Sequence, residues 1–400
     1  MTAPPNLLGP CRASAKAGAI ALLVGMLMLS ACQVAIPPSL SPTPDPTDPG
    51  GENPSPLHLP TPSFAVQAFL WWQPAQVSRR DIELVKEMGF GWIKQSFAWR
   101  DIEGIEKGAY DWYFADLVVE EVEKAGLQLL VRIDRQPFWS QGPGAELYLN
   151  GPPKDITDFR DFCYVLADRY RGRIPAYQVW NEPNLSREWG EREPNAAEYV
   201  ELLTACHSGI KTADPDAVVI SAGLAPTGID LPDAIPDDRF LQEMYAAGAA
   251  PHFDILGLNA PGYKAPPEVG PDDAADPDLG WGGHRTFAFR HVEDMRAIMV
   301  ANGDEDKQVA VLEMGWTTDP RPDSPYHWHS VSEEQQADYL VRAYQYARDN
   351  WPWAGLLTAV YIAKFDWTTE SEEYWWSITY PGFPETRVRP AYDALMAMPK

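Results

Sequence analysis

The sequence predicts one α/β domain, a single (β/α)8 TIM barrel, over residues 64–400. Apolar runs of strand length alternate along this stretch with segments whose apolar residues recur at helical spacing. The runs are continuous rather than alternating, which is typical of a parallel sheet covered on both faces, and they number eight. A doubly wound open sheet is the alternative, but no Gly-rich phosphate-binding turn follows the first strand.

The predicted strands are apolar runs of strand length. The strands are expected at Phe64–Trp72, Gly91–Ala98, Leu127–Ile133, Ala176–Trp180, Ala217–Ala222, Phe253–Leu258, Gln308–Leu312 and Ala354–Ile362. Each predicted helix follows a strand. The helices are expected at Val77–Met88, Tyr113–Ala125, Ile156–Tyr170, Asn195–Ala213, Phe240–Ala247, Phe287–Ala301, Val331–Asp349 and Pro390–Met398. A segment rich in Pro, Asp and Gly, from Pro261 to Arg285, is expected to form an elaborated loop after strand six.

The amino terminus has the layout of a secretory signal. Arg12 and Lys16 precede an apolar run over residues 17–31, which is too short to span a bilayer comfortably. The run ends in Leu29-Ser30-Ala31-Cys32, which resembles the lipobox of bacterial lipoproteins. The resemblance implies a signal peptide over residues 1–31, lipid attachment at Cys32 and a place in the cell envelope, outside the cytoplasm. An ordinary signal peptide on a secreted protein is the alternative.

Residues 32–63 are dominated by Pro, with Ser, Thr and Asp between. Such a segment has little to bury and forms neither helix nor central strand. We expect a Pro-rich linker that holds the barrel away from the lipid anchor.

Charge and cysteine content limit the partners. The chain has 57 acidic and 32 basic residues, a formal net charge of −25. Nucleic acid is therefore not expected as a partner, and the membrane is expected to be reached only through the lipid at Cys32. Cys163 and Cys206, in helical segments, either pair in an oxidising compartment or remain buried thiols. No metal or cofactor is expected, and the sequence does not predict an oligomeric state.

The run from Ala176 to Asn184 is the first candidate for a functional site. It begins as an apolar strand and ends abruptly in Asn181, Glu182 and Pro183. A carboxylate at the mouth of an apolar strand is costly unless it has a role, and active-site residues of barrels lie at the carboxyl ends of strands. Glu313 closes a strand three βα units later, on the opposite side of the barrel mouth. Two carboxylates should therefore converge there.

Two converging glutamates suit glycoside hydrolysis, in which one protonates the leaving oxygen while the other attacks or activates water. Mutual repulsion and burial should raise the pKa of one carboxyl and leave the other ionised, which separates the two roles.

The motifs around both glutamates resemble those of clan A retaining glycoside hydrolases, with the cellulase-like families 5 and 39 the most similar. Trp180-Asn181-Glu182-Pro183 resembles the acid/base motif, and Leu312-Glu313-Met314-Gly315-Trp316 the nucleophile motif. The resemblance implies that Glu182 is the acid/base, Glu313 the nucleophile and Asn181 a donor to the sugar 2-hydroxyl. The implied substrate is a poly- or oligosaccharide.

Two supporting positions depart from that pattern. Lys94 stands near the place where many members carry Arg, and we expect it to hold the nucleophile. The stretch from Asn259 to Tyr263 stands where many members carry His-x-Tyr after strand six. Asn259 is expected to support the glutamate pair, and Tyr263 is expected to bind substrate within reach of the nucleophile.

Tryptophans near strand ends are candidate sugar platforms, because pyranose faces stack on indole rings. Any of them could equally be a packing residue, and Trp375 and Trp376 are open to either interpretation. The four candidates are Trp99, Trp139, Trp316 and Trp367.

Two other functions remain open. One is a carbohydrate-binding barrel lipoprotein without catalytic activity, which the pair of glutamates disfavours. The other is a metal-dependent hydrolase that uses His327 and His329, although no third ligand is in view. The sequence specifies neither the sugar and linkage nor exo versus endo action.

Overall fold

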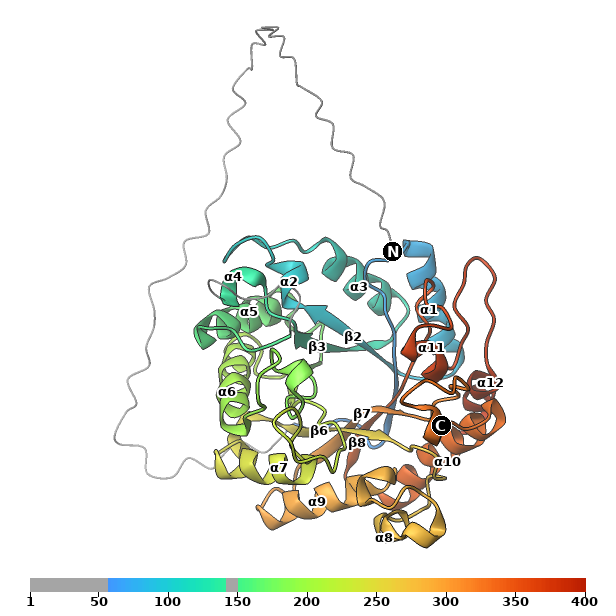
Figure 1. Ribbon diagram of the computed structural model, residues 1–400. Helices are drawn as coiled ribbons and strands as arrows, with labels where there is room; N and C mark the ends of the chain where they lie inside the picture. The colour runs from blue at the N-terminus through green and yellow to red at the C-terminus, as the bar shows by residue number, and fades with distance from the viewer. Residues whose placement is uncertain (1–56, 142–149) are drawn as a thin grey trace, which may run out of the picture. The chain divides into compact units, whose positions relative to one another are not determined.

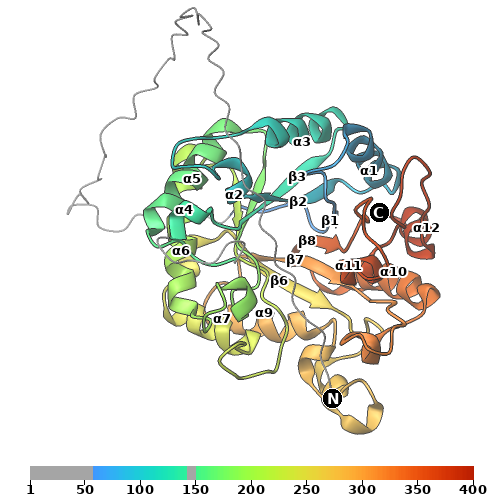
Figure 2. The same cartoon turned by 45° about the horizontal axis from the view of Figure 1, so that its top comes forward.

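The computed structural model describes residues 57–141 and 150–400, which form a closed barrel of eight parallel strands in chain order (Figure 1). Strand β1 pairs with both β2 and β8, and this pairing closes the barrel. The helices surround the strands in the view of Figure 2. The predicted (β/α)8 architecture is confirmed. The predicted signal peptide, Cys32 and the linker up to residue 56 lie outside the described residues.

All eight predicted strands are present. They are β1 (Ser63–Gln67), β2 (Trp92–Ala98), β3 (Gln128–Asp134), β4 (Ala176–Val179), β5 (Val218–Ile220), β6 (Ile255–Pro261), β7 (Gln308–Gly315) and β8 (Ala354–Ala359). β1 is shorter than expected, because the chain leaves the sheet after Gln67 and Phe69 lines a cleft instead. β7 is longer and carries Glu313 within the strand.

The eight predicted helices are also present, with bounds shifted by a few residues. They are α1 (Ala75–Glu87), α3 (Tyr113–Lys124), α5 (Ile156–Arg169), α6 (Ala196–Ala213), α7 (Asp237–Ala246), α9 (His291–Ala301), α10 (Glu333–Asn350) and α12 (Pro390–Ala397). Short helices decorate the loops: α2 (Trp99–Ile102), α4 (Phe138–Gln141), α8 (Pro271–Ala275) and α11 (Glu372–Trp376). The expected elaborated loop after β6 holds α8. In the described part of the chain, helices long and apolar enough to cross a membrane are absent.

Residues 57–63, assigned to the linker from the sequence, belong to the barrel instead. Leu59 is buried, and its backbone N–H donates to Gln308 Oε1 at 2.8 Å. Gln308 Nε2 in turn donates to the Leu59 carbonyl at 2.9 Å. Because Gln308 begins β7, these bonds fasten the entering chain to the amino-terminal end of the barrel.

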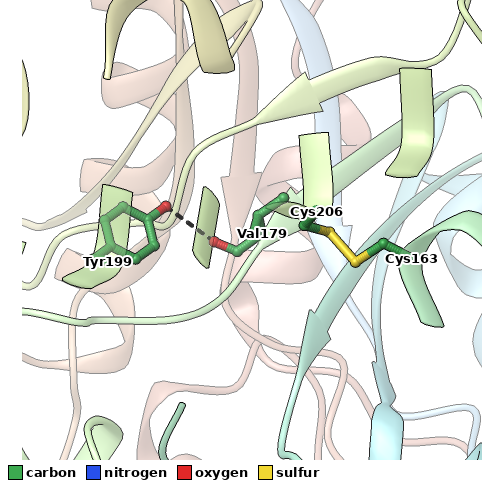
Figure 3. Close-up of a disulfide and its surroundings, with 4 residues drawn as sticks. All are labelled: Cys163, Val179, Tyr199 and Cys206. Carbon is green, nitrogen blue, oxygen red and sulfur yellow. Dashed lines mark hydrogen bonds between the residues drawn. A yellow bond between two sulfur atoms is a disulfide. The ribbon is translucent and has the colours of Figure 1, made fainter. Parts of the chain in front are cut away.

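Helix α6 fixes the strand ends next to the candidate site (Figure 3). The Tyr199 hydroxyl donates to the Val179 carbonyl at 3.1 Å and accepts from the Ala222 N–H at 2.6 Å. A disulfide joins Cys163 on α5 to Cys206 on α6, with 5.3 Å between the Cα atoms. The sequence left open whether these two cysteines pair or remain thiols, and in the structure they are paired. Together these contacts hold the ends of β4 and β5 against a cross-linked helix pair.

Candidate active site

A cleft of about 780 Å³ opens at the carboxyl ends of the strands, and both Glu182 and Glu313 line it. Glu182 follows β4 and Glu313 lies near the end of β7. The pairing inferred from strand positions is therefore present in three dimensions: the two carboxylates face one cavity.

Local backbone geometry turns Glu182 into the cleft. Trp180 and Glu182 both have left-handed φ angles, 74° and 40°, which are rare for residues with a side chain. The buried Trp180 ring donates from Nε1 to the Glu188 carbonyl at 2.8 Å. The Glu182 N–H donates to the Gly223 carbonyl at 3.1 Å. These contacts compensate for strained backbone conformations of the kind that cluster at active sites.

Two side chains hold the Glu182 carboxylate. Asn259 Nδ2 donates to Oε1 at 3.0 Å, and Arg187 Nη2 donates to Oε2 at 2.8 Å. Gly223 makes room for the Asn259 amide, because a Cβ at that position would overlap the amide oxygen. Asn259 thus supports Glu182. Arg187 is 58% exposed, so its contact with Oε2 is open to solvent.

Two cations hold the Glu313 carboxylate. Lys94 Nζ lies 3.0 Å from Oε1, and Arg132 Nη1 lies 3.4 Å from the same oxygen. Lys94 also donates to the Leu312 carbonyl at 3.0 Å, and Arg132 reaches Asn181 Oδ1 at 3.2 Å. The position of Lys94 is the one expected from the sequence.

These cations determine the charge of Glu313. Burial alone would raise the pKa of Glu313, but Lys94 and Arg132 outweigh it and the net pKa is lowered. Burial lowers the pKa of Lys94 to about 8, against the opposing pull of Glu313. At neutral pH the pair is therefore an ammonium and a carboxylate, the state that a nucleophile needs.

Tyr263 lies at the cleft, as expected of a substrate-binding residue, and among the described residues no hydrogen bond joins it to Glu313. It lines the cleft, but its hydroxyl donates to the Pro226 carbonyl at 3.0 Å. A hydroxyl has one proton, so that proton is not directed at Glu313.

Two of the four predictions of a tryptophan that stacks on a sugar are wrong. Trp99 and Trp316 are fully buried and have no face to offer a sugar. Trp99 Nε1 donates to Glu103 Oε2 at 2.7 Å, and Trp316 Nε1 donates to the Ala265 carbonyl at 2.9 Å. The Trp316 ring packs on Gly262, where a Cβ would collide with it.

The other two candidates lie outside the set of residues that line the cleft. Trp139 is half-buried and donates from Nε1 to the Glu103 carbonyl at 2.6 Å. Trp367 packs edge-on against Phe69, with ring centroids 4.8 Å apart, and Phe69 itself lines the cleft. That Trp139 or Trp367 stacks on a sugar stays a prediction. Trp376, on α11, lines the cleft directly.

Sequence reasoning missed several residues that line the cleft: Arg132, Arg187, Glu188 and Tyr361. Arg132 had a readable signal, since it is a charged residue inside the apolar stretch of β3. Glu188 ends a single turn of 3-10 helix in the segment after β4 and had none. Burial, and then Glu182, raise the pKa of Glu188 to about 7, and Asn150 Nδ2 donates to its Oε2 at 2.6 Å.

Of the two histidines, His329 belongs to an aromatic cluster at the cleft. His329 lines the cleft and packs on Tyr263 and Trp328, with centroid distances of 5.1 and 4.8 Å. Burial lowers the pKa of His329 to about 4. His327 Nδ1 lies 3.4 Å from the Asp319 carbonyl. Within residues 57–141 and 150–400, groups of three or more His, Cys, Asp or Glu placed to hold a metal ion are absent.

Comparison with known proteins agrees with the barrel fold. Several solved glycoside hydrolases have a similar fold. A family 39 glycoside hydrolase from the gut symbiont Bacteroides cellulosilyticus WH2 superposes with a TM-score of 0.61 at 19% identity, covering 84% of this chain and 63% of that one. For xylanase 10B from Thermotoga maritima the TM-score is 0.53 at 14% identity, covering 83% and 93%. A glucosidase from Croceicoccus marinus gives 0.57 at 13% identity, covering 86% and 68%.

Sequence similarity is more limited. No family model matches the chain. A β-xylosidase from Geobacillus stearothermophilus is 25% identical over 126 residues, which are 29% of this chain. The match spans a quarter of the length of that β-xylosidase.

Proposed function

We propose that this protein is a retaining glycoside hydrolase that cleaves O-glycosidic bonds of an oligo- or polysaccharide by double displacement. One observation carries the proposal: Glu182 and Glu313 line the same cleft, and Glu313 is held as a carboxylate by Lys94 and Arg132. The related barrels include a xylanase, a glucosidase and a family 39 glycoside hydrolase, which supports a carbohydrate substrate.

In the first step, a Glu313 oxygen attacks the anomeric carbon of the bound sugar while the bond to the leaving oxygen breaks. Protonated Glu182 gives its proton to that oxygen, and the product is a glycosyl ester on Glu313. Lys94 and Arg132 stabilise the charge of the nucleophile and are placed before the reaction begins.

In the second step, Glu182 as a carboxylate takes a proton from water, and the water oxygen attacks the anomeric carbon. The ester bond breaks and Glu313 regains its negative charge. Asn181 Oδ1 already accepts from Arg132, so its Nδ2 is left to donate to the sugar 2-hydroxyl.

Turnover of a panel of aryl glycosides and soluble polysaccharides tests the proposal. Wild type should cleave at least one of them. Glu313→Gln should lose about 10³-fold or more in kcat/KM on every substrate, and Glu182→Gln should do so on the polysaccharides, whose leaving oxygen must be protonated. Glu198→Gln, on the outer face of α6, is the matched control and should keep full activity. Binding of a glycan without any turnover would instead support a non-catalytic carbohydrate-binding barrel.

We also propose that the barrel is anchored to the cell envelope through a lipid on Cys32, with the alternative of a secreted protein. The lipobox-like sequence before Cys32 supports an anchor, and the Cys163–Cys206 disulfide supports an oxidising compartment. Labelling with a radioactive fatty acid in a bacterial host tests it. Wild type should incorporate label and Cys32→Ser should not; an unlabelled wild type would favour secretion.

A further inference from the structure

Exposed aromatic side chains gather outside the cleft, on the loop after β1 and the start of α3. Trp72 is 58% exposed and Tyr113 is 68% exposed. Both contact Phe114, with ring centroids 4.5 Å and 5.1 Å away. Single exposed aromatics are common on soluble proteins, but a contiguous cluster with one large open ring is typical of a binding surface.

The Trp72 ring is held in place. Its backbone has a left-handed φ of 58°, which is rare for a bulky residue. Its Nε1 donates to Asp101 Oδ2 on α2 at 3.2 Å, and its neighbour Trp71 is buried against Phe97. A ring kept exposed, strained and fixed loses little freedom when a ligand stacks on it.

The position of Trp72 is continuous with the cleft on two sides. Phe69, on the same loop, lines the cleft. Asp101, which holds the Trp72 ring, also lies close enough to Arg135 for their charges to interact, and Arg135 lines the cleft as well. A sugar chain that lies over Arg135 would therefore extend from the Trp72 ring towards the two glutamates.

Arg135 is suited to contact such a chain. It has a left-handed φ of 59°, and its backbone N–H is fixed by Asn150 Oδ1 at 2.9 Å. Within the described residues its exposed guanidinium forms no hydrogen bond or ion pair of its own, although the chain is rich in carboxylates. Its donors remain available for sugar hydroxyls.

We propose that Trp72, outside the cleft, and Arg135, at its edge, form an additional sugar-binding subsite, which takes the distal sugars of a chain longer than a disaccharide. Trp72 stacks on the apolar face of one sugar, and Arg135 donates to hydroxyls between that sugar and the cleft. Because this subsite extends the hydrolase activity proposed above, it points to a polymeric substrate rather than to small glycosides.

Binding and turnover are measured separately to test the subsite. Soluble xylan, glucomannan and mixed-linkage β-glucan are each cast into native gels, and the retardation of wild type, Trp72→Ala and Trp72→Tyr is compared. The same proteins are assayed on an aryl glycoside of one sugar and on the polymer that retards wild type. Tyr164→Ala is the control, because Tyr164 is an aromatic residue 40% exposed on α5 and not part of the cleft.

Trp72→Ala should weaken polymer binding and lower kcat/KM on the polymer roughly 3- to 10-fold. Its kcat/KM on the aryl glycoside should stay within about twofold of the wild-type value. Trp72→Tyr should retain most of the binding, and Tyr164→Ala all of it. Equal losses on short and long substrates would overturn the proposal, as would a wild type that no polymer retards; the cluster would then be a protein-binding surface. Polymer binding that depends on Trp72, without turnover of any glycoside, would refute the hydrolase and leave the subsite standing.

Discussion

Lys94→Met should raise the pH at which the enzyme becomes active, because Lys94 holds Glu313 in its ionised form. The two charges are 3.0 Å apart, and Lys94 is only 1% exposed. At an effective dielectric constant of about 20 the attraction has an upper bound of about 5.5 kcal/mol. Contact with an opposite charge typically lowers a carboxyl pKa by about 1–3 units. Arg132 remains at 3.4 Å in the variant and keeps part of the effect. We therefore expect the acidic limb of kcat/KM to move upward by about 1–2 units.

The assay is the pH dependence of kcat/KM on an aryl glycoside with an activated leaving group. Such a leaving group needs little protonation, so the acidic limb reports the nucleophile rather than the acid. Lys107→Met is the control. Lys107 is half-exposed and pairs with Asp161 at 2.9 Å, away from the cleft. An acidic limb that stays in place in Lys94→Met would refute the assignment of Lys94 and weaken that of Glu313.

Three further perturbations follow from the same contacts. Gly223→Ala should push Asn259 off Glu182, because the new Cβ overlaps the amide, and should lower kcat/KM by about 10-fold or more; unchanged kinetics would contradict this packing. Gln67 is 4% exposed and lines the cleft, and its Oε1 has no hydrogen-bond partner among the described residues. Gln67→Met should therefore raise KM by roughly 10-fold without loss of stability in urea; an unaltered KM would exclude a contact with substrate. The pKa of Glu188 is about 7 in the folded state against 4.5 ordinarily, so wild type should lose stability as the pH rises from about 4.5 through about 7. Glu188→Gln should remove this loss. The difference in unfolding free energy between variant and wild type should therefore be about 1–3 kcal/mol more favourable to the variant at alkaline pH than at acidic pH. The same difference at both pH values would contradict the raised pKa.

The barrel and its two glutamates were predictable because both depend on local pattern. Continuous apolar runs mark strands of a covered parallel sheet, and Glu182 and Glu313 stand at the polar ends of two such runs. Lys94 was also predictable, since a charge inside a buried strand needs a partner. The same signal was present at Arg132, which contacts both Glu313 and Asn181.

Other parts of the site depend on packing that sequence does not display. Trp99 and Trp316 follow strands as sugar platforms do, but both rings are buried among neighbours distant in sequence, such as Gly262 beneath Trp316. Glu188 and Trp376 reach the cleft from short helical turns in the segments after β4 and β8, whose path is set by tertiary contacts. Whether a residue near a strand end lines the cavity or fills the core is decided by which loop covers it.

Covalent labelling of Glu313 tests the central claim most directly. The protein is incubated with an activated 2-fluoro sugar, whose glycosyl ester hydrolyses slowly, and the labelled peptide is mapped by mass spectrometry. We predict one sugar per chain, attached to Glu313, with no label in Glu313→Gln. Label on another residue, or turnover with inversion at the anomeric carbon, would contradict the double displacement.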